Sequence, residues 1–156
     1  PTLYNYYASK EQLLVGAIEL GMTDFFSYIL NGIEDVPREA RLFEIINRHA
    51  GYKMRHRLIA RANDRLIDPQ FTPMFLPEDA ARHFIGRMDN YRHTVEALVR
   101  DYVDDDAPVS PKVVTLALLS QCDRMAYWYH PDGPMTPEQA LKQVTILIQR
   151  MLGTAA

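Results

Sequence analysis

The chain has 156 residues, of which 47% are hydrophobic and 24% are charged, a composition typical of an ordinary globular domain with one sizeable core. The formal net charge of -3 argues against a protein that binds nucleic acid through its overall charge. The single cysteine, Cys122, excludes an internal disulfide or a cysteine-cluster metal site. Because the longest nearly uncharged apolar run, residues 113–122, is much shorter than the roughly 20 residues that cross a bilayer, we expect no membrane span or secretory signal and a location in the reducing cytoplasm.

The first expected helix begins after Ser9, which with Gln12 forms a capping-box pattern. Apolar residues follow at helical spacing as far as Asn31 and Gly32, where the helix should end. Aromatic residues crowd the positions before Ser9, although the chain holds nothing upstream for them to pack against. We therefore expect that residues preceding Pro1 are missing.

A second helix is expected from Pro37 to about Leu66, since proline is tolerated in the first turn of a helix. Its apolar positions change face near Gly51, which predicts either a kink there or neighbours on several sides. On a regular helix Arg55 would project among apolar side chains, so we expect it to meet a buried carboxylate or an anionic ligand. A basic series at four-residue spacing is expected to face solvent: Lys53, Arg57, Arg61 and Arg65.

The proline-interrupted segment from Asp68 to Pro77 cannot form one regular helix, yet it is too apolar to be a solvated linker. We expect it to fold back onto the body of the domain. The next helix is expected over residues 81–102, which carry the clearest amphipathic stripe in the chain, and the acidic residues 104–106 should form a loop.

Two later helix starts are predicted where a hydroxyl residue precedes proline, at Ser110–Pro111 and at Thr136–Pro137. The residues between these helices, 130–134, are typical of a tight turn and should make the two helices antiparallel. No strand-like alternation occurs anywhere in the sequence. The expected fold class is therefore all-α, a helical bundle.

Residues 2–14, Thr-Leu-Tyr-Asn-Tyr-Tyr-Ala-Ser-Lys-Glu-Gln-Leu-Leu, resemble the end of the helix-turn-helix of TetR-family transcriptional repressors. The resemblance implies that residues 1–33 are a remnant of the DNA-binding domain with its linking helix. Residues 34–156 would form a dimeric, all-helical ligand-binding domain that releases operator DNA when its ligand binds.

The same resemblance implies that four residues near the start of the chain contact DNA phosphates: Thr2, Tyr4, Tyr6 and Lys10. Their hydroxyl and ammonium groups can donate hydrogen bonds to phosphate oxygens. Tyr7 matches an aromatic residue that packs the small domain. Tyr6 departs from the histidine common in the family and Tyr7 from the common phenylalanine. For the tyrosines, packing in a small core is the alternative. The bases of the operator would be read by residues before Pro1, so this chain is not expected to bind an operator by itself.

Residues 127–138 are similar to a branch of the family associated with lipid and acyl-thioester catabolism. The implied ligand is small and apolar, with acyl-CoA thioesters among the candidates. The expected pocket lies between the helices that begin near Pro37, Ala81 and Pro111, and residues 71–76 should close it. An acidic end of the ligand would satisfy Arg55. Core packing is the alternative role for the other pocket candidates, which are apolar or aromatic: Phe71, Met74, Phe75, Met88, Tyr91, Met125, Trp128 and Tyr129.

The last two helices look more apolar than a monomer needs, which predicts a homodimer. The family resemblance implies that these helices pair with their partner copies in a four-helix interface. The interface candidates share positions on these helices: Leu118, Cys122, Leu141, Val144, Leu147, Ile148 and Met151. Two alternatives are a dimeric interaction module without a small-molecule pocket and an enzyme built in a helical bundle.

The sequence carries no pattern that favours catalysis, a cofactor or a metal. No two histidines lie three or four residues apart, and neither a serine-nucleophile motif nor a glycine-rich phosphate loop is present. Cys122 is expected to act as a small buried hydrophobe rather than as a reactive thiol.

Overall fold

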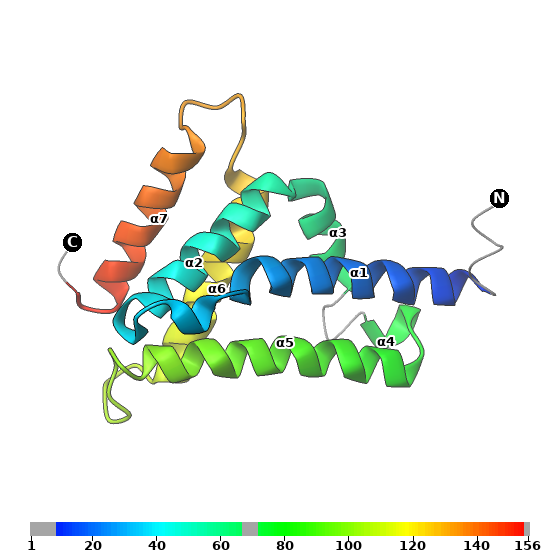
Figure 1. Ribbon diagram of the computed structural model, residues 1–156, viewed down its shortest axis with the longest axis horizontal. Helices are drawn as coiled ribbons and strands as arrows, with labels where there is room; N and C mark the ends of the chain where they lie inside the picture. The colour runs from blue at the N-terminus through cyan, green and yellow to red at the C-terminus, as the bar shows by residue number, and fades with distance from the viewer. Residues whose placement is uncertain (1–8, 67–71, 155–156) are drawn as a thin grey trace.

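The computed structural model describes residues 9–66 and 72–154, and these residues form only helices, turns and loops (Figure 1). The expected all-α class is confirmed. In chain order the elements are α1 (Lys10–Leu30), the 3-10 turn η2 (Ile33–Asp35), α2 (Arg38–Arg55), α3 (Arg57–Leu66), α4 (Thr72–Phe75), α5 (Glu78–Val99), α6 (Pro111–Trp128) and α7 (Pro137–Met151).

Helix α1 begins and ends where the sequence predicts. The side chain of Ser9 accepts a hydrogen bond of 3.2 Å from the backbone N–H of Gln12, which satisfies one free donor of the first turn. After the last turn Gly32 adopts a left-handed conformation, φ 66°, which glycine reaches without steric cost. By length and composition alone residues 10–35 could cross a membrane, but the same holds for a core helix that packs along one face. Such a face is present in α1 and comprises Ile18, Met22, Phe25 and Ile29.

The helix expected from Pro37 to Leu66 is divided in two at His56, whose backbone leaves the helical region with φ -108° and ψ 39°. Of the two alternatives predicted for the change of apolar face, neighbours on several sides are confirmed, since α2 packs against α1, α5, α6 and α7, whereas the break in the helix lies at His56 and not at Gly51. Because α3 turns away from the axis of α2, Leu58 does not continue the apolar face of Met54. Met54 is buried, whereas Leu58 is 82% exposed.

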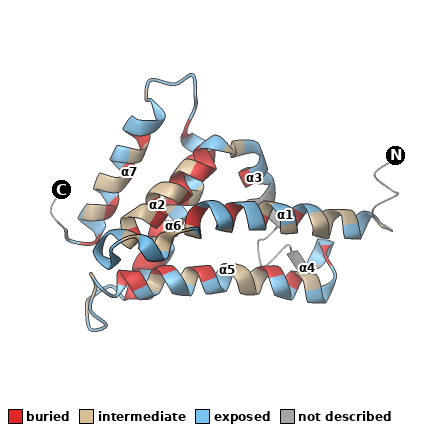
Figure 2. Cartoon of the chain, in the orientation of Figure 1, coloured by how far each residue is buried: buried red, intermediate tan, exposed pale blue. Residues whose placement is uncertain are grey.

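The main core lies where α2 packs along α6, with α1, α5 and α7 around them. Figure 2 shows buried residues concentrated along α2 and α6. A smaller second core joins the first half of α1 to the first half of α5, and Leu76 is buried in it. The proline-interrupted segment thus folds back through Leu76, as expected, while Met74 and Phe75 of α4 are exposed.

Helices α6 and α7 form an antiparallel pair joined by a tight turn in which the N–H of Gly133 donates to the carbonyl of His130 at 2.9 Å (Figure 1). Both predicted starts are confirmed, since each helix begins at its proline. Thr136 and Gln139 form a complete capping box before α7. The side chain of Ser110 makes no capping hydrogen bond before α6.

Candidate functional site

Five polar side chains meet in the interior of the bundle, where a domain of this size normally buries apolar groups. They come from α2, α3, α5 and α6, and we call them the α2–α6 polar cluster: His49, Lys53, Asp64, Tyr91 and Asp123. Buried polar groups are costly unless they are paired, so such a cluster is retained only where its members satisfy one another.

His49 is fully enclosed and joins α5 to α6. Its Nδ1 lies 3.1 Å from the hydroxyl of Tyr91, and its Nε2 lies 3.0 Å from Oδ1 of Asp123. Burial lowers the pKa of His49 although Asp123 opposes the shift, so the imidazole is neutral near pH 7. The tautomer with the proton on Nε2 fits both contacts, because Nε2–H then donates to the carboxylate and Nδ1 accepts from Tyr91.

Lys53 is 6% exposed and carries the positive charge of the cluster. Its ammonium lies 2.5 Å from Oδ1 of Asp64 and 2.8 Å from Oδ1 of Asp123. Burial acts to lower the pKa of Lys53, but the two carboxylates outweigh it and raise the pKa above its ordinary value. The prediction that Lys53 faces solvent is therefore wrong, and its long-range partners explain why.

The two carboxylates respond differently to the shared ammonium. Burial opposes the ionisation of Asp123, yet the hydrogen bond from His49 and the charge of Lys53 hold its pKa below the ordinary value. Burial raises the pKa of Asp64 even though Lys53 acts against it. Asp123 also keeps 41% of its side-chain surface accessible, far more than His49 or Lys53. Asp123 is thus a partly exposed member of the cluster, and its carboxylate is already bonded to His49 and Lys53 of α2.

Aromatic side chains pack against the polar cluster on the side that faces α1. Phe25 makes edge contacts with His49, Tyr52 and Tyr91, with ring centroids 4.9 to 5.9 Å apart. The Lys53 ammonium lies 5.4 Å from the centre of the same ring. The hydroxyl of Tyr52 donates to Asp24 of α1 at 2.8 Å. A movement of α1 therefore disturbs the surroundings of His49 and Lys53 directly.

The residues predicted to bind a ligand do not gather on one surface. Tyr91, Met125 and Tyr129 are buried and Met88 is partly buried, whereas Trp128 is exposed like Met74 and Phe75. Phe71 lies outside the described residues. Among the described members of this set, Tyr91 is the one that reaches the polar cluster through a hydrogen bond.

Arg55 does not project into an apolar interior, as it would on a regular helix. It is exposed at the end of α2, and its guanidinium lies 5.4 Å from the ring centre of Tyr28. The interruption at His56 is the reason, because it turns Leu58 and Ile59 away from the side on which Arg55 lies. The buried cation of this region is Lys53, two residues earlier.

The predicted dimer contacts fall into two groups. Four of them are buried within the chain's own core and present no surface to a partner: Leu118, Cys122, Val144 and Ile148. Leu147 and Met151 are exposed on α7, and Leu141 is half-buried. On α6 the exposed apolar residues include Val113 and Leu116, which the sequence pattern did not single out.

Burial raises the pKa of the Cys122 thiol, so that it is unreactive at neutral pH.

Among the predicted phosphate-contacting residues, Lys10 is exposed at the first position of α1. Thr2, Tyr4 and Tyr6 lie outside the described residues. Within the described part of the chain, no group of three or more histidine, cysteine, aspartate or glutamate side chains is arranged to hold a metal ion.

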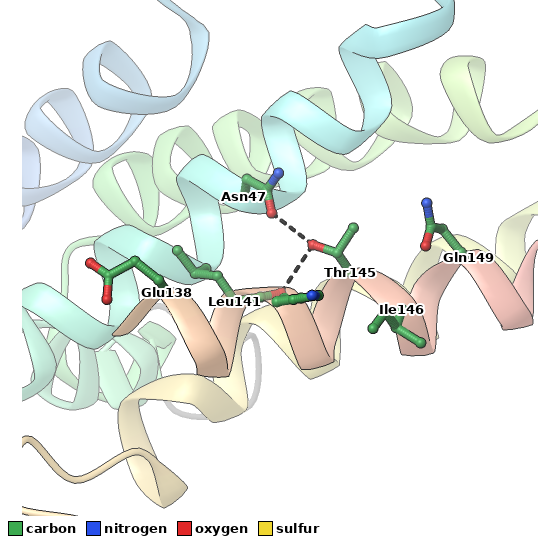
Figure 3. Close-up of a pocket in the computed structure, with 7 residues that line it drawn as sticks. Asn47, Glu138, Leu141, Thr145, Ile146 and Gln149 are labelled. Atoms are coloured by element: carbon green, nitrogen blue, oxygen red, sulfur yellow. Dashed lines mark hydrogen bonds between the residues drawn. The ribbon is translucent and has the colours of Figure 1, made fainter. Parts of the chain in front are cut away.

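A groove of about 610 Å³ lies along the contact between α2 and α7 (Figure 3). The hydroxyl of Thr145 lies 2.9 Å from Oδ1 of Asn47 and 3.0 Å from the carbonyl of Leu141. Among the described residues that were predicted for a site, Leu141 alone lines this groove. Its lining is completed by exposed or half-buried residues of α7: Glu138, Lys142, Ile146 and Gln149.

Comparison with known proteins gives a consistent family match. Residues 35–152 match the family model described as tetracyclin repressor-like, C-terminal domain. No curated protein sequence matches the chain.

Three solved structures share the fold at low sequence identity. AibR, solved in complex with isovaleryl coenzyme A and operator DNA, superposes with a TM-score of 0.77 at 21% identity, covering 94% of this chain and 78% of AibR. The TetR family regulator PfmR from Thermus thermophilus gives 0.73 at 20% identity, with 99% and 81% covered. A TetR/AcrR family regulator from Thermobifida fusca gives 0.65 at 20% identity, with 99% and 79% covered.

Proposed function

The chain belongs to the tetracyclin repressor-like (TetR) family of transcriptional regulators. From this premise we propose that ligand binding at the α2–α6 polar cluster controls the affinity of the protein for operator DNA. The observation that carries the proposal is the contact of Asp123 with both His49 and Lys53. This contact ties α2, the central helix of the core, to α6, while the Asp123 side chain stays partly exposed. The protein acts in the cytoplasm.

The dimer forms through α6 and α7, which expose apolar side chains that a lone domain would keep from water. Four such residues are Val113, Leu116, Leu147 and Met151. The opposite faces of the same helices supply the core, where Leu118 and Ile148 are fully buried. A shift of α6 at Asp123 therefore moves the surface that sets the spacing between the two protomers.

The ligand is a small molecule with an apolar portion, and acyl thioesters are the first class to test, because the structurally similar AibR was solved with isovaleryl coenzyme A. The apolar portion would enter between α2, α5 and α6 by separating them near Tyr91 and Met125, since both side chains are buried in the packed core. A hydrogen-bond donor of the ligand would compete with His49 and Lys53 for the carboxylate of Asp123. DNA contact by Thr2, Tyr4, Tyr6 and Lys10 is part of the same proposal.

The test measures operator release by fluorescence anisotropy with the full-length gene product and a labelled operator. Isovaleryl, octanoyl and palmitoyl coenzyme A are titrated into the wild type and into Asp123→Asn, which keeps the size of the side chain but removes its charge. We expect at least one thioester to release the operator from the wild type. Asp123→Asn should need on the order of tenfold more of it, since a charge-assisted hydrogen bond is lost. Equal midpoints for the two proteins would reject the site.

A further inference from the structure

A second cluster of charged and aromatic side chains lies at the C-terminal end of α6, outside the polar cluster. We call it the α6-end cluster: Arg57, Arg61, Arg124, Tyr127 and Trp128. From this arrangement we infer a binding site for a phosphorylated nucleotide, with the base stacked on Trp128 and the phosphates held by the arginines. The inference deepens the proposed function and rests on it, since it makes the ligand a nucleotide-bearing molecule such as a coenzyme A thioester.

The ring of Tyr127 brings two guanidinium groups together. Arg61 lies 4.9 Å from its centre and Arg124 lies 5.3 Å from it. The two arginines come from different helices, α3 and α6, so the fold and not local sequence unites them. A planar guanidinium that rests on an aromatic ring keeps its N–H groups free at the edge, which suits bidentate contact with phosphate oxygens.

Part of this arrangement has a structural role. Arg61 donates to the carbonyls of Ala126 at 2.8 Å and Tyr127 at 3.1 Å, and Arg57 reaches Ala126 at 3.4 Å. These contacts satisfy carbonyls that the end of α6 leaves without helical partners. Capping accounts for two of the three arginines. It does not account for Arg124, whose guanidinium, within the described residues, rests on the Tyr127 ring alone.

The charge of the cluster is not balanced locally. In the part of the chain that the structure describes, Arg57, Arg61 and Arg124 form no ion pair with a carboxylate, and Arg57 instead lies 3.3 Å from Nδ1 of His130. Three positive charges beside one another raise the local potential and attract a polyvalent anion. Lys53 contacts both Asp64 and Asp123, and its single positive charge offsets one of their two negative charges.

Trp128 supplies the surface for a base. Its side chain is 41% exposed at the last position of α6, four residues after Arg124, so both groups lie on one face of the helix. This is the side of α6 that carries Val113, but Trp128 lies about three helical turns beyond Leu116, past the apolar residues assigned to the dimer interface. An exposed indole beside cations is a stacking surface that accepts any base and prefers fused rings. Asp123 directly precedes Arg124, so a ligand held here by its nucleotide lies within one helical turn of the polar cluster.

The experiment uses Trp128, the chain's single tryptophan, as its own reporter. Coenzyme A, adenosine 3′,5′-bisphosphate, adenosine and inorganic phosphate are titrated while the tryptophan emission is recorded. We expect saturable quenching by the first two, far weaker binding of the last two, and weakening with added salt. If coenzyme A quenches and the bisphosphate does not, or if inorganic phosphate binds as tightly as coenzyme A, the nucleotide assignment is wrong.

Variants complete the test by calorimetry with coenzyme A. Arg124→Gln should weaken binding about tenfold by removing a charged donor, and Trp128→Ala about tenfold by removing the stack. Arg82→Gln is the matched control, because it removes an exposed arginine charge from α5, where the guanidinium pairs with the solvent-exposed Glu78. Thermal melts check that each variant is folded. Wild-type affinity in Arg124→Gln and Trp128→Ala would overturn the site.

The outcomes separate this inference from the proposed function. If coenzyme A binds through Arg124 and Trp128 but no thioester releases the operator, the site stands and the regulatory role fails. If a thioester releases the operator while Trp128 emission and Arg124→Gln show no effect, the site fails and the regulatory role stands.

Discussion

The Nε2 atom of His49 lies 3.0 Å from Oδ1 of Asp123, a contact that joins α2 to α6 across 74 residues of sequence. The same oxygen accepts from Lys53 at 2.8 Å. One carboxylate oxygen therefore holds a neutral imidazole and an ammonium in the middle of the bundle. The stability of the domain and its response to pH should both depend on this oxygen.

Lys53→Met should destabilise the fold by about 3 kcal/mol at pH 7, because it leaves Asp64 and Asp123 close together without the cation between them. The measurement is the free energy of unfolding in urea. Arg82→Gln, which removes a solvent-exposed charge, should change it by less than about 0.5 kcal/mol. Equal values for the two variants would mean that the buried pairs contribute nothing.

Acid should destabilise the protein through His49. The pKa of His49 in the folded protein lies below the ordinary 6.5. As the pH falls through 6.5, His49 therefore binds a proton in the unfolded chain but not in the folded protein. Stability that is present above pH 6.5 is therefore lost on acidification, by at most about 1.4 kcal/mol per pH unit. The unfolding free energy should fall between about pH 7.5 and 5.5.

His49→Gln should flatten this pH dependence, since glutamine can donate to Asp123 and accept from Tyr91 but does not titrate. Asp64 acts in the opposite sense, because its raised pKa makes the folded state protonate first, and keeping the measurement above about pH 5.5 limits its contribution. An unchanged slope in His49→Gln would assign the acid sensitivity to other groups.

The oligomeric state should depend on the exposed apolar residues of α6 and α7 and not on the buried ones. Leu147→Asp and Val113→Asp should convert a dimer into a folded monomer, whereas Ile148→Asp should unfold the chain because that side chain is fully buried. Light scattering gives the mass and circular dichroism the fold. Leu20→Asp, on the exposed face of α1, is the control and should stay dimeric. A stable dimer in Leu147→Asp and Val113→Asp would place the interface elsewhere.

Local signals in the sequence predicted the elements well. The starts of α1, α6 and α7 follow from Ser9, Pro111 and the capping box at Thr136, because a cap is a contact between residues three apart. The change of apolar face in the long second helix correctly indicated an irregularity. It misplaced the break, since a shift in periodicity extends over several residues and the backbone departs from helix only at His56.

The candidate site could not be predicted in the same way. Lys53 belongs to a regular basic series, and only Asp64 and Asp123, which the fold brings to it from other helices, make it a buried residue. Arg55 would be the buried cation only on one continuous helix, which the chain does not form. Likewise, Leu118 and Leu147 look alike in sequence, and only packing separates the core from the exposed face.

The central claim, that a ligand at the polar cluster changes the spacing of the two protomers, is tested most directly by a distance between them. A spin label at Glu11→Cys reports on the exposed first turn of α1, and the buried Cys122 thiol, with its raised pKa, should not compete for the label. Electron–electron double resonance is recorded on the full-length dimer with and without the thioester that releases the operator best. We predict a shift of several Å in the inter-label distance for the wild type, and the same shift at about tenfold higher concentration for Asp123→Asn. Operator release with an unchanged distance in the wild type would contradict the account.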